Sequence, residues 1–361
     1  MTPRTTASGS LARRSLLGAG AAGMAALLAA CTTGPSTGDS AGTAAGSSDG
    51  GAAAGSYPRT VKHALGETVI PAEPKRVVTI SWVNPDVVLA LGVVPVGVES
   101  VTWGGNDAKS TDWFDAELEK QGGTAPEQFS ATDGIATDAI AALTPDLIVA
   151  AYSGLDAEQY AALEAIAPTL AYPEGSGPWS TSWQDSVTLV GEALAREDAA
   201  AALIEDVEGA MSTAAADNPA LEGTTFIYGT IDPTAADQIS IYTDADNRPK
   251  FLQQLGMVNA PVVTENQPAD GAFFMSWSAE KADELVSDVL LSWFNDAAAV
   301  DAVVADPLLG QIPAIKNGTF VAQSDAAEVL SISAASPLSI PWAIENVVPE
   351  IVAAAQKSKS L

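Results

Sequence analysis

Cysteine is almost absent from this chain: Cys31 is the only one among its 361 residues. A single thiol cannot form a disulfide within the chain, and it cannot supply the thiolates of a structural zinc site. Histidine is equally scarce, since His63 is the only one, and we expect it at the surface of a hairpin. No His, Tyr and carboxylate side chains show the spacing of an iron site. We therefore predict no metal held directly by the protein and no cofactor.

Basic side chains are also few. The chain has 16 lysines and arginines against 45 aspartates and glutamates, a net charge of −29. Nucleic acid and anionic lipid both attract clustered cations, so this balance argues against binding to either by charge. Any attachment to a membrane must then come from something other than charge.

The N-terminal stretch supplies such an attachment. Arg13 and Arg14 precede an apolar, Ala-rich segment at 16–30, which is too short for a membrane span and has only small residues before Cys31. The pattern resembles a bacterial lipoprotein signal, in which the cysteine is acylated and becomes the new N-terminus. The paired arginines are similar to those of a twin-arginine signal, although an ordinary secretory signal fits nearly as well. We predict a signal peptide at 1–30 and a protein anchored by acyl chains to the outer face of a bacterial cell membrane.

The next segment has the composition of a tether. Between residues 32 and 56, 22 of 25 residues are Gly, Ala, Ser or Thr. Such a segment cannot bury enough apolar surface to fold, and a flexible chain of this length spans about 25 to 30 Å. We therefore place a tether at 31–56 and expect the folded part to begin near Tyr57.

Beyond the tether, short apolar runs alternate with helical patterns, which is typical of an α/β protein. Strands are predicted at 77–80, 93–98, 146–151, 169–172, 225–228, 239–242, 288–293 and 319–322. Helices are predicted at 86–91, 135–143, 156–166, 249–255 and 278–285, with Ser278 as an N-cap. The Ala-rich, acidic segment 196–216 predicts one long helix of about 30 Å.

The two halves of the folded part resemble each other. In the first half, Asp138 lies eight residues before Asp146, which begins a predicted strand. In the second half, Glu280 lies eight residues before Asp288, which also begins a predicted strand. We predict two lobes, 57–195 and 219–361, each with a mainly parallel sheet flanked by helices and joined by a connecting helix at 196–218, with a ligand held between them. Each of the two acids could stabilise a helix N-terminus, or both could share a role on the surface.

Several motifs resemble, in order and spacing, periplasmic-binding-protein domains of the iron-siderophore and cobalamin type. These motifs are EPKRVV at 73–78, LALGVVPVGV at 89–98, IAALTPDLIV at 140–149, IAPT at 166–169 and PAIKNG at 313–318. The resemblance implies two α/β lobes, a single connecting helix, limited hinge motion and delivery of the ligand to the permease of an ABC importer. It also implies that one acid on each lobe docks on the permease, by position Asp138 and Glu280. Lobe one of this family usually has Glu, so Asp138 is a shorter substitute.

Aromatic side chains are the candidates for contact with a bulky, apolar chelate. We single out as ligand-binding candidates Trp82, Trp103, Trp179, Tyr228, Tyr242, Arg248 and Trp277. Each ring could instead be packing, and for Trp293 and Trp342 we expect packing. Arg248 could bind the ligand or pair with Asp244 or Asp246.

The shortage of cations argues against a highly anionic tris-catecholate and favours a neutral or cationic ferric hydroxamate. We predict a monomeric siderophore-binding lipoprotein that is not an enzyme. Heme or a corrinoid is the alternative ligand, and a lipid-anchored hydrolase is the alternative class. No histidine is placed as a base for a hydrolase, but a glycosidase that uses carboxylates, or an adhesin or sensor on the same scaffold, stays compatible with the sequence.

Overall fold

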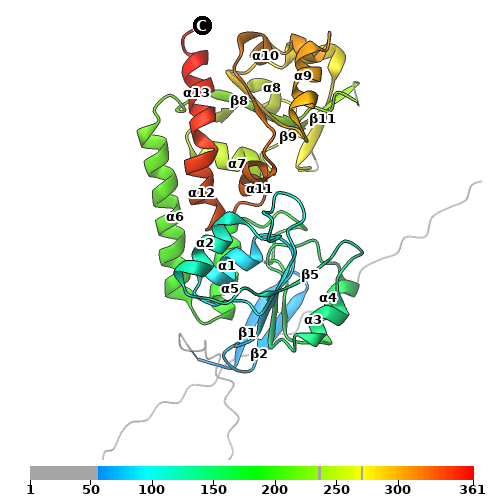
Figure 1. The fold of residues 1–361 in the computed structure, drawn as a ribbon, viewed down its shortest axis with the longest axis vertical. Helices are drawn as coiled ribbons and strands as arrows, with labels where there is room; N and C mark the ends of the chain where they lie inside the picture. The colour runs from blue at the N-terminus through cyan, green and yellow to red at the C-terminus, as the bar shows by residue number, and fades with distance from the viewer. Residues whose placement is uncertain (1–55, 235–236, 270) are drawn as a thin grey trace, which may run out of the picture. The chain divides into compact units, whose positions relative to one another are not determined.

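A computed structural model describes residues 56–234, 237–269 and 271–361. The described residues form two lobes, each built around its own sheet (Figure 1). Cys31, the predicted signal peptide and the tether up to residue 55 lie outside the described residues. Among the helices that the structure describes, none combines the length and the apolar character needed to cross a bilayer.

Lobe one contains a five-stranded sheet in the order β5-β4-β3-β6-β7, with all neighbours parallel, and a separate antiparallel hairpin of β1 and β2. The strands are β1 (Arg59–His63), β2 (Gly66–Ile70), β3 (Val77–Thr79), β4 (Gly97–Glu99), β5 (Glu127–Phe129), β6 (Leu147–Val149) and β7 (Thr169–Leu170). The predicted strands at 77–80, 146–151 and 169–172 are confirmed in a shorter form, whereas β4 overlaps the predicted strand at 93–98 only at its last two residues.

Helices cover both faces of this sheet. They are α1 (Asn84–Ala90), α2 (Asp112–Lys120), α3 (Thr137–Ala142), α4 (Ala157–Glu164) and α5 (Trp183–Ala193). Side chains of a strand alternate between faces, so Leu147 and Val149 belong to the core that includes α1, α2 and α5. Ile148 belongs to the core that includes α3 and α4. This two-sided burial explains why β6 reads as a continuous apolar run.

The long helix predicted at 196–216 is confirmed as α6 (Glu197–Asp217), 21 residues long. It packs against α5 and connects the two lobes (Figure 1). Arg196 precedes it and donates from Nη1 to the carbonyl of Leu91, which ties the start of α6 to the end of α1.

Lobe two contains a mixed sheet in the order β11-β9-β8-β12-β13, with β10 paired to β8. The strands are β8 (Thr225–Thr230), β9 (Gln238–Tyr242), β10 (Val258–Asn259), β11 (Phe274–Ser278), β12 (Val289–Trp293) and β13 (Phe320–Gln323). The pairs β8–β10, β8–β12 and β12–β13 are parallel, whereas β8–β9 and β9–β11 are antiparallel. The predicted fold class is confirmed, with an antiparallel edge on the second sheet.

The helices of lobe two and the C-terminal part follow. They are α7 (Asn247–Gln254), α8 (Pro261–Thr264), η1 (Ala279–Glu284), α9 (Ala297–Ala305), η2 (Leu309–Gln311), α10 (Pro313–Asn317), α11 (Ala326–Ser333), α12 (Ser339–Asn346) and α13 (Val348–Ser358). The helix predicted at 278–285 is a 3-10 helix with non-helical dihedrals at Lys281, and the Ser278 side chain makes no capping hydrogen bond. Ser278 thus occupies the predicted N-cap position, but its side chain does not cap the helix.

The C-terminal segment does not stay within lobe two. Helix α12 packs against α2 and α6, and Trp342 contacts Trp113 with ring centroids 5.3 Å apart. Before α12, Ser336 donates from Oγ to Asp86 Oδ2 at 2.5 Å, and Trp113 Nε1 donates to the same oxygen at 2.8 Å. Helix α12 therefore contacts an element of lobe one, whereas α13 packs against β12 and β13 of lobe two. The expected packing role of Trp342 agrees with the structure.

His63 is not at the surface, so that expectation is wrong. It lies in the predicted hairpin, but only 1% of it is exposed. Its Nε2 lies 2.9 Å from Thr68 Oγ1, and its ring lies 5.1 Å from the ring of Tyr160. Burial lowers the pKa of His63, which keeps the imidazole neutral beside these two hydroxyls.

The buried carboxylate at the joint should make stability depend on pH. Burial raises the pKa of Asp86 from 3.8 to about 6, against the opposing hydrogen bonds from Ser336 and Trp113. The folded state therefore holds a proton more tightly than the unfolded chain, and its stability falls as the pH rises from about 4 to about 6. The loss should approach about 3 kcal/mol in the free energy of unfolding. Asp86→Asn keeps an acceptor oxygen and removes this titration.

Urea unfolding of wild type and Asp86→Asn at several pH values measures the effect. The variant should gain stability relative to wild type between pH 4 and 7. Asp301→Asn, an exposed acid on α9, serves as the control and should show no such gain. An Asp86→Asn difference that is the same at pH 4 and pH 7 would contradict the prediction.

Candidate functional site

A cleft of about 610 Å³ lies between the two lobes. This volume lies within the range of small-molecule sites, about 300 to 1,000 Å³. Lobe one contributes Trp82, Trp103, Tyr152, Pro178, Trp179 and Ser180. The other lining residues are Ala245, Asp246, Asn247, Arg248, Gly271, Ala272, Phe273, Trp293, Val329 and Ser333.

The position of this cleft follows from strand direction. Ligands of open parallel sheets bind beyond the carboxyl ends of the strands, where loops rather than ladder hydrogen bonds occupy the edge. Trp82 follows β3, Trp103 follows β4 and Tyr152 follows β6, while Trp293 is the last residue of β12. The two sheets thus present loops from these edges to the same space.

The wall from lobe one is aromatic. The ring of Trp179 lies 5.8 Å from that of Tyr152 and 6.4 Å from that of Trp82. Trp179 lies close to Gly154, where an added Cβ would come within 2.1 Å of its Nε1, so only glycine at 154 allows this ring position. Trp82 and Trp179 remain 42% and 53% exposed, which is a large apolar area for an unliganded surface.

A second indole pair joins the two lobes across the cleft. Trp103 of lobe one and Trp293 of lobe two meet edge to face, with centroids 5.8 Å apart and an interplanar angle of 70°. This geometry is favourable for aromatic rings, and both indoles line the cleft. Trp293, for which we expected packing, thus packs against Trp103 and also lines the cleft.

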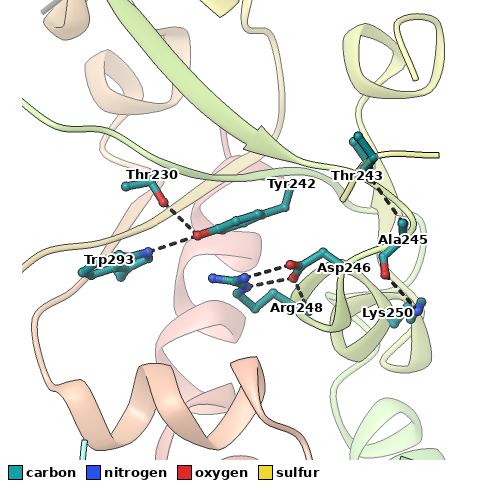
Figure 2. Close-up of polar contacts among 9 residues, drawn as sticks. Thr230, Tyr242, Thr243, Ala245, Asp246, Arg248, Lys250 and Trp293 are labelled. Atoms are coloured by element: carbon teal, nitrogen blue, oxygen red, sulfur yellow. Dashed lines mark hydrogen bonds and ion pairs between the residues drawn. The ribbon is translucent and has the colours of Figure 1, made fainter. Parts of the chain in front are cut away.

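The polar part of the cleft is built around Arg248 (Figure 2). Its Nε and Nη2 donate to the two carboxylate oxygens of Asp246 at 2.8 and 2.7 Å, and Asp246 also accepts from the Arg248 amide at the start of α7. The guanidinium lies 3.6 Å from the centroid of the Tyr242 ring. Tyr242 in turn lies 2.8 Å from Thr230 Oγ1 and accepts from Trp293 Nε1 at 3.2 Å. The Asp246 carboxylate and the Tyr242 ring together hold the Arg248 side chain in one orientation.

Arg248 keeps donors for a ligand. Burial opposes its charge, but the Asp246 carboxylate raises the pKa of Arg248 on balance. Nη1 makes no hydrogen bond with any residue that the structure describes. Arg248 can therefore both pair with Asp246 and bind a ligand. The ion pair uses Nε and Nη2, and Nη1 stays available as a donor. Asp244 instead accepts from Gln253 and Asn259.

Tyr152 brings a phenol from lobe one toward this group. Burial raises the pKa of Tyr152 to about 12, with a further contribution from Asp246, while Arg248 and the Asn247 side chain act in the opposite direction. The Tyr152 hydroxyl thus stays neutral and can donate or accept within the cleft.

Of the seven predicted ligand-binding residues, the structure places four on the cleft surface: Trp82, Trp103, Trp179 and Arg248. Tyr242 lies directly behind Arg248 as a support. Tyr228 is 1% exposed beneath Tyr242, with its hydroxyl donated to Gln323, and burial raises its pKa. Trp277 is on β11 away from the cleft and donates to the Lys281 carbonyl at 2.9 Å. Neither Tyr228 nor Trp277 is among the residues that line the cleft.

The two acids expected on the permease side are both exposed and outside the cleft. Asp138 is in the first turn of α3 and Glu280 is in the first turn of η1. Sequence reasoning missed Tyr152 and Asn247, and it gave Asp246 only as an ion-pair partner. The position of Tyr152 just after the buried strand β6 could have indicated it, because ligands bind beyond the carboxyl ends of parallel strands.

The fold and cleft define a two-lobed binding protein. The periplasmic binding protein family matches residues 77–326, and the chain belongs to this family. Among solved structures, PiaA of Streptococcus pneumoniae TIGR4 in complex with ferrichrome is similar, with a TM-score of 0.75 and 32% identity, covering 82% of this chain and 99% of PiaA.

Two curated proteins are also similar in sequence. The probable siderophore-binding lipoprotein YfiY of Bacillus subtilis is 33% identical over 44% of this chain, and the match spans only 45% of YfiY. The ferric enterobactin-binding periplasmic protein FepB of Escherichia coli is 25% identical over 73% of this chain and 83% of FepB.

Proposed function

We propose that this protein is the substrate-binding lipoprotein of an ABC importer and captures a ferric hydroxamate siderophore between its lobes. The charge of the cleft carries this proposal. Among the described residues that line the cleft, only Asp246 and Arg248 are charged, and they form an ion pair. The walls are otherwise aromatic or small, so the site fits a bulky ligand whose net charge is near zero.

The names of the relatives point to more than one chelate chemistry. PiaA was solved with ferrichrome, a hydroxamate chelate, whereas FepB is named for ferric enterobactin, a catecholate chelate. A ferric trihydroxamate core is neutral, because three hydroxamate anions balance one ferric ion, while a ferric tris-catecholate carries three negative charges. An anion of that kind needs several unpaired cations, and this cleft offers one guanidinium already paired to Asp246.

Within this proposal the residues have distinct roles. Trp82, Trp103 and Trp179 cover the apolar periphery of the chelate, and Arg248 donates from Nη1 to its oxygen atoms. Tyr152 adds a neutral hydroxyl from the opposite lobe. The iron enters already surrounded by oxygens of the chelator, and binding rather than bond cleavage is the activity. Heme and corrinoids are the alternative ligands for the same apolar cleft.

Tryptophan emission should report binding directly, because four indoles line the cleft. A neutral ferric trihydroxamate should quench emission with a low-micromolar or tighter Kd, about −8 kcal/mol. Arg248→Lys should weaken this binding about tenfold, since an ammonium cannot replace the planar fork and its stacking on Tyr242. Arg76→Lys, an exposed arginine of lobe one, is the matched control.

The same titration with ferric enterobactin, heme and cyanocobalamin separates the ligand classes. Binding of one of these three in place of every hydroxamate tested would overturn the substrate class and leave the fold unaffected. Unchanged affinity in Arg248→Lys would remove Arg248 from the site.

Anchoring depends on Cys31, which the sequence places after an export signal. Cys31→Ala should abolish acylation, so that the protein leaves the membrane fraction or accumulates as precursor. Cell fractionation and metabolic labelling with a fatty acid measure both outcomes. If the variant is still processed and retained in the membrane fraction as well as wild type, the lipoprotein assignment is wrong.

Docking on the permease is proposed for Asp138 and Glu280, one on each lobe. Both are exposed, so each could form a charge-assisted pair with an arginine of a permease. The double variant Asp138→Ala/Glu280→Ala should lose most uptake of iron chelate while its ligand Kd stays within about twofold, since neither residue lines the cleft. Glu119→Ala/Asp301→Ala removes the same charge from exposed positions on α2 and α9 and serves as the control. Normal uptake by the first double variant at limiting protein would contradict the docking role.

A further inference from the structure

Lobe one holds a second cavity of about 210 Å³ that shares Trp179 with the ligand cleft. This volume is well above the ~10–15 Å³ that one water molecule requires. Its walls include Ser81, Glu99, Phe129, Leu155 and Trp179. We call this cavity the side pocket. One indole lines both spaces, so the side pocket adjoins the ligand cleft at Trp179.

Glu99 is the one titratable residue among those walls. Its carboxylate is half-buried at the end of β4, and Oε2 accepts from the Ser81 amide at 2.8 Å. In the described part of the chain, no Lys, Arg or His nitrogen lies within ion-pair distance of Glu99. Lys109 lines a neighbouring cavity together with Glu99, but it does not line the side pocket. The side pocket therefore presents a negative charge without a counter-ion.

The Glu99 carboxylate keeps one oxygen for a ligand. Oε2 accepts from the Ser81 amide, whereas Oε1 accepts no hydrogen bond from the residues that the structure describes. An alkylammonium group, with three N–H donors on an apolar stem, matches a single carboxylate in a mainly apolar pocket.

The geometry points to the side pocket as the binding site for a cationic arm of the ligand. This inference rests on the proposed function, in which the neutral iron core of a ferric hydroxamate occupies the cleft. The chemical class is then a trihydroxamate that carries a free primary ammonium group. The arm passes Trp179, its methylenes contact Phe129 and Leu155, and its ammonium donates to Glu99.

A purely structural role of Glu99 gives different expectations. Ser81 and Val83 both have positive φ, 66° and 67°, so the carboxylate could serve only to hold this loop through the Ser81 amide. Glu99→Gln separates the two roles, because the amide oxygen still accepts from Ser81 while the negative charge is lost. Glu119→Gln removes the same charge from an exposed position on α2 and controls for the net charge of the lobe.

The test compares two ferric chelates with the same core. Ferrioxamine B carries a free ammonium at one end, and its N-acetylated form carries a neutral amide there. Wild type and Glu119→Gln should bind ferrioxamine B about tenfold more tightly than the acetylated form in fluorescence titrations. Glu99→Gln should bind both with similar Kd, close to the wild-type value for the acetylated form, which also shows that the variant is folded.

Each other result has a definite meaning. Equal affinity of wild type for the two chelates, or the same preference in Glu99→Gln as in wild type, would overturn the cationic-arm site while leaving hydroxamate binding intact. If Glu99→Gln weakens both chelates equally, Glu99 only supports the loop and the inference fails. If neither chelate binds wild type at micromolar concentration, the proposed ligand class itself is wrong.

Discussion

A buried carboxylate holds the two lobes in register. Asp86 on α1 accepts from Trp113 of lobe one and from Ser336, which precedes α12. Through this oxygen the C-terminal segment is fixed to lobe one, although the chain has just left the sheet of lobe two. The lobes are thus connected by α6 and again by α12, and one continuous core includes side chains of both sheets. Two connections allow less relative motion than one, so the width of the cleft is set largely by the fold.

The direction of the strands then decides which residues reach the ligand. Trp82 and Trp103 were predictable because each lies just beyond the carboxyl end of a short buried strand. Inside a strand the same reasoning fails, since alternate residues face opposite sides and sequence does not say which side is open. Tyr228 therefore faces the core, whereas Trp293, at the last position of β12, faces the cleft.

Other errors come from contacts between distant parts of the chain. His63 is buried because Tyr160, 97 residues later, covers it. The return of α12 to lobe one depends on Ser336 and Asp86, which are 250 residues apart. Propensity and local periodicity carry no information on such pairs, so neither contact could be predicted from the sequence.

Electrostatics connects the site to the composition of the whole chain. With a net charge of −29, the protein repels anions at long range, and salt of physiological strength screens this field only beyond about 8 Å. In the cleft, Asp246 compensates Arg248, so no local positive field offsets that repulsion. A neutral chelate is neither repelled by the net charge of the protein nor in need of a positive field in the cleft. A chelate with an ammonium group is attracted by the negative net charge and by an unpaired carboxylate such as Glu99. The same acidity that argues against catecholates therefore favours ligands with a cationic end.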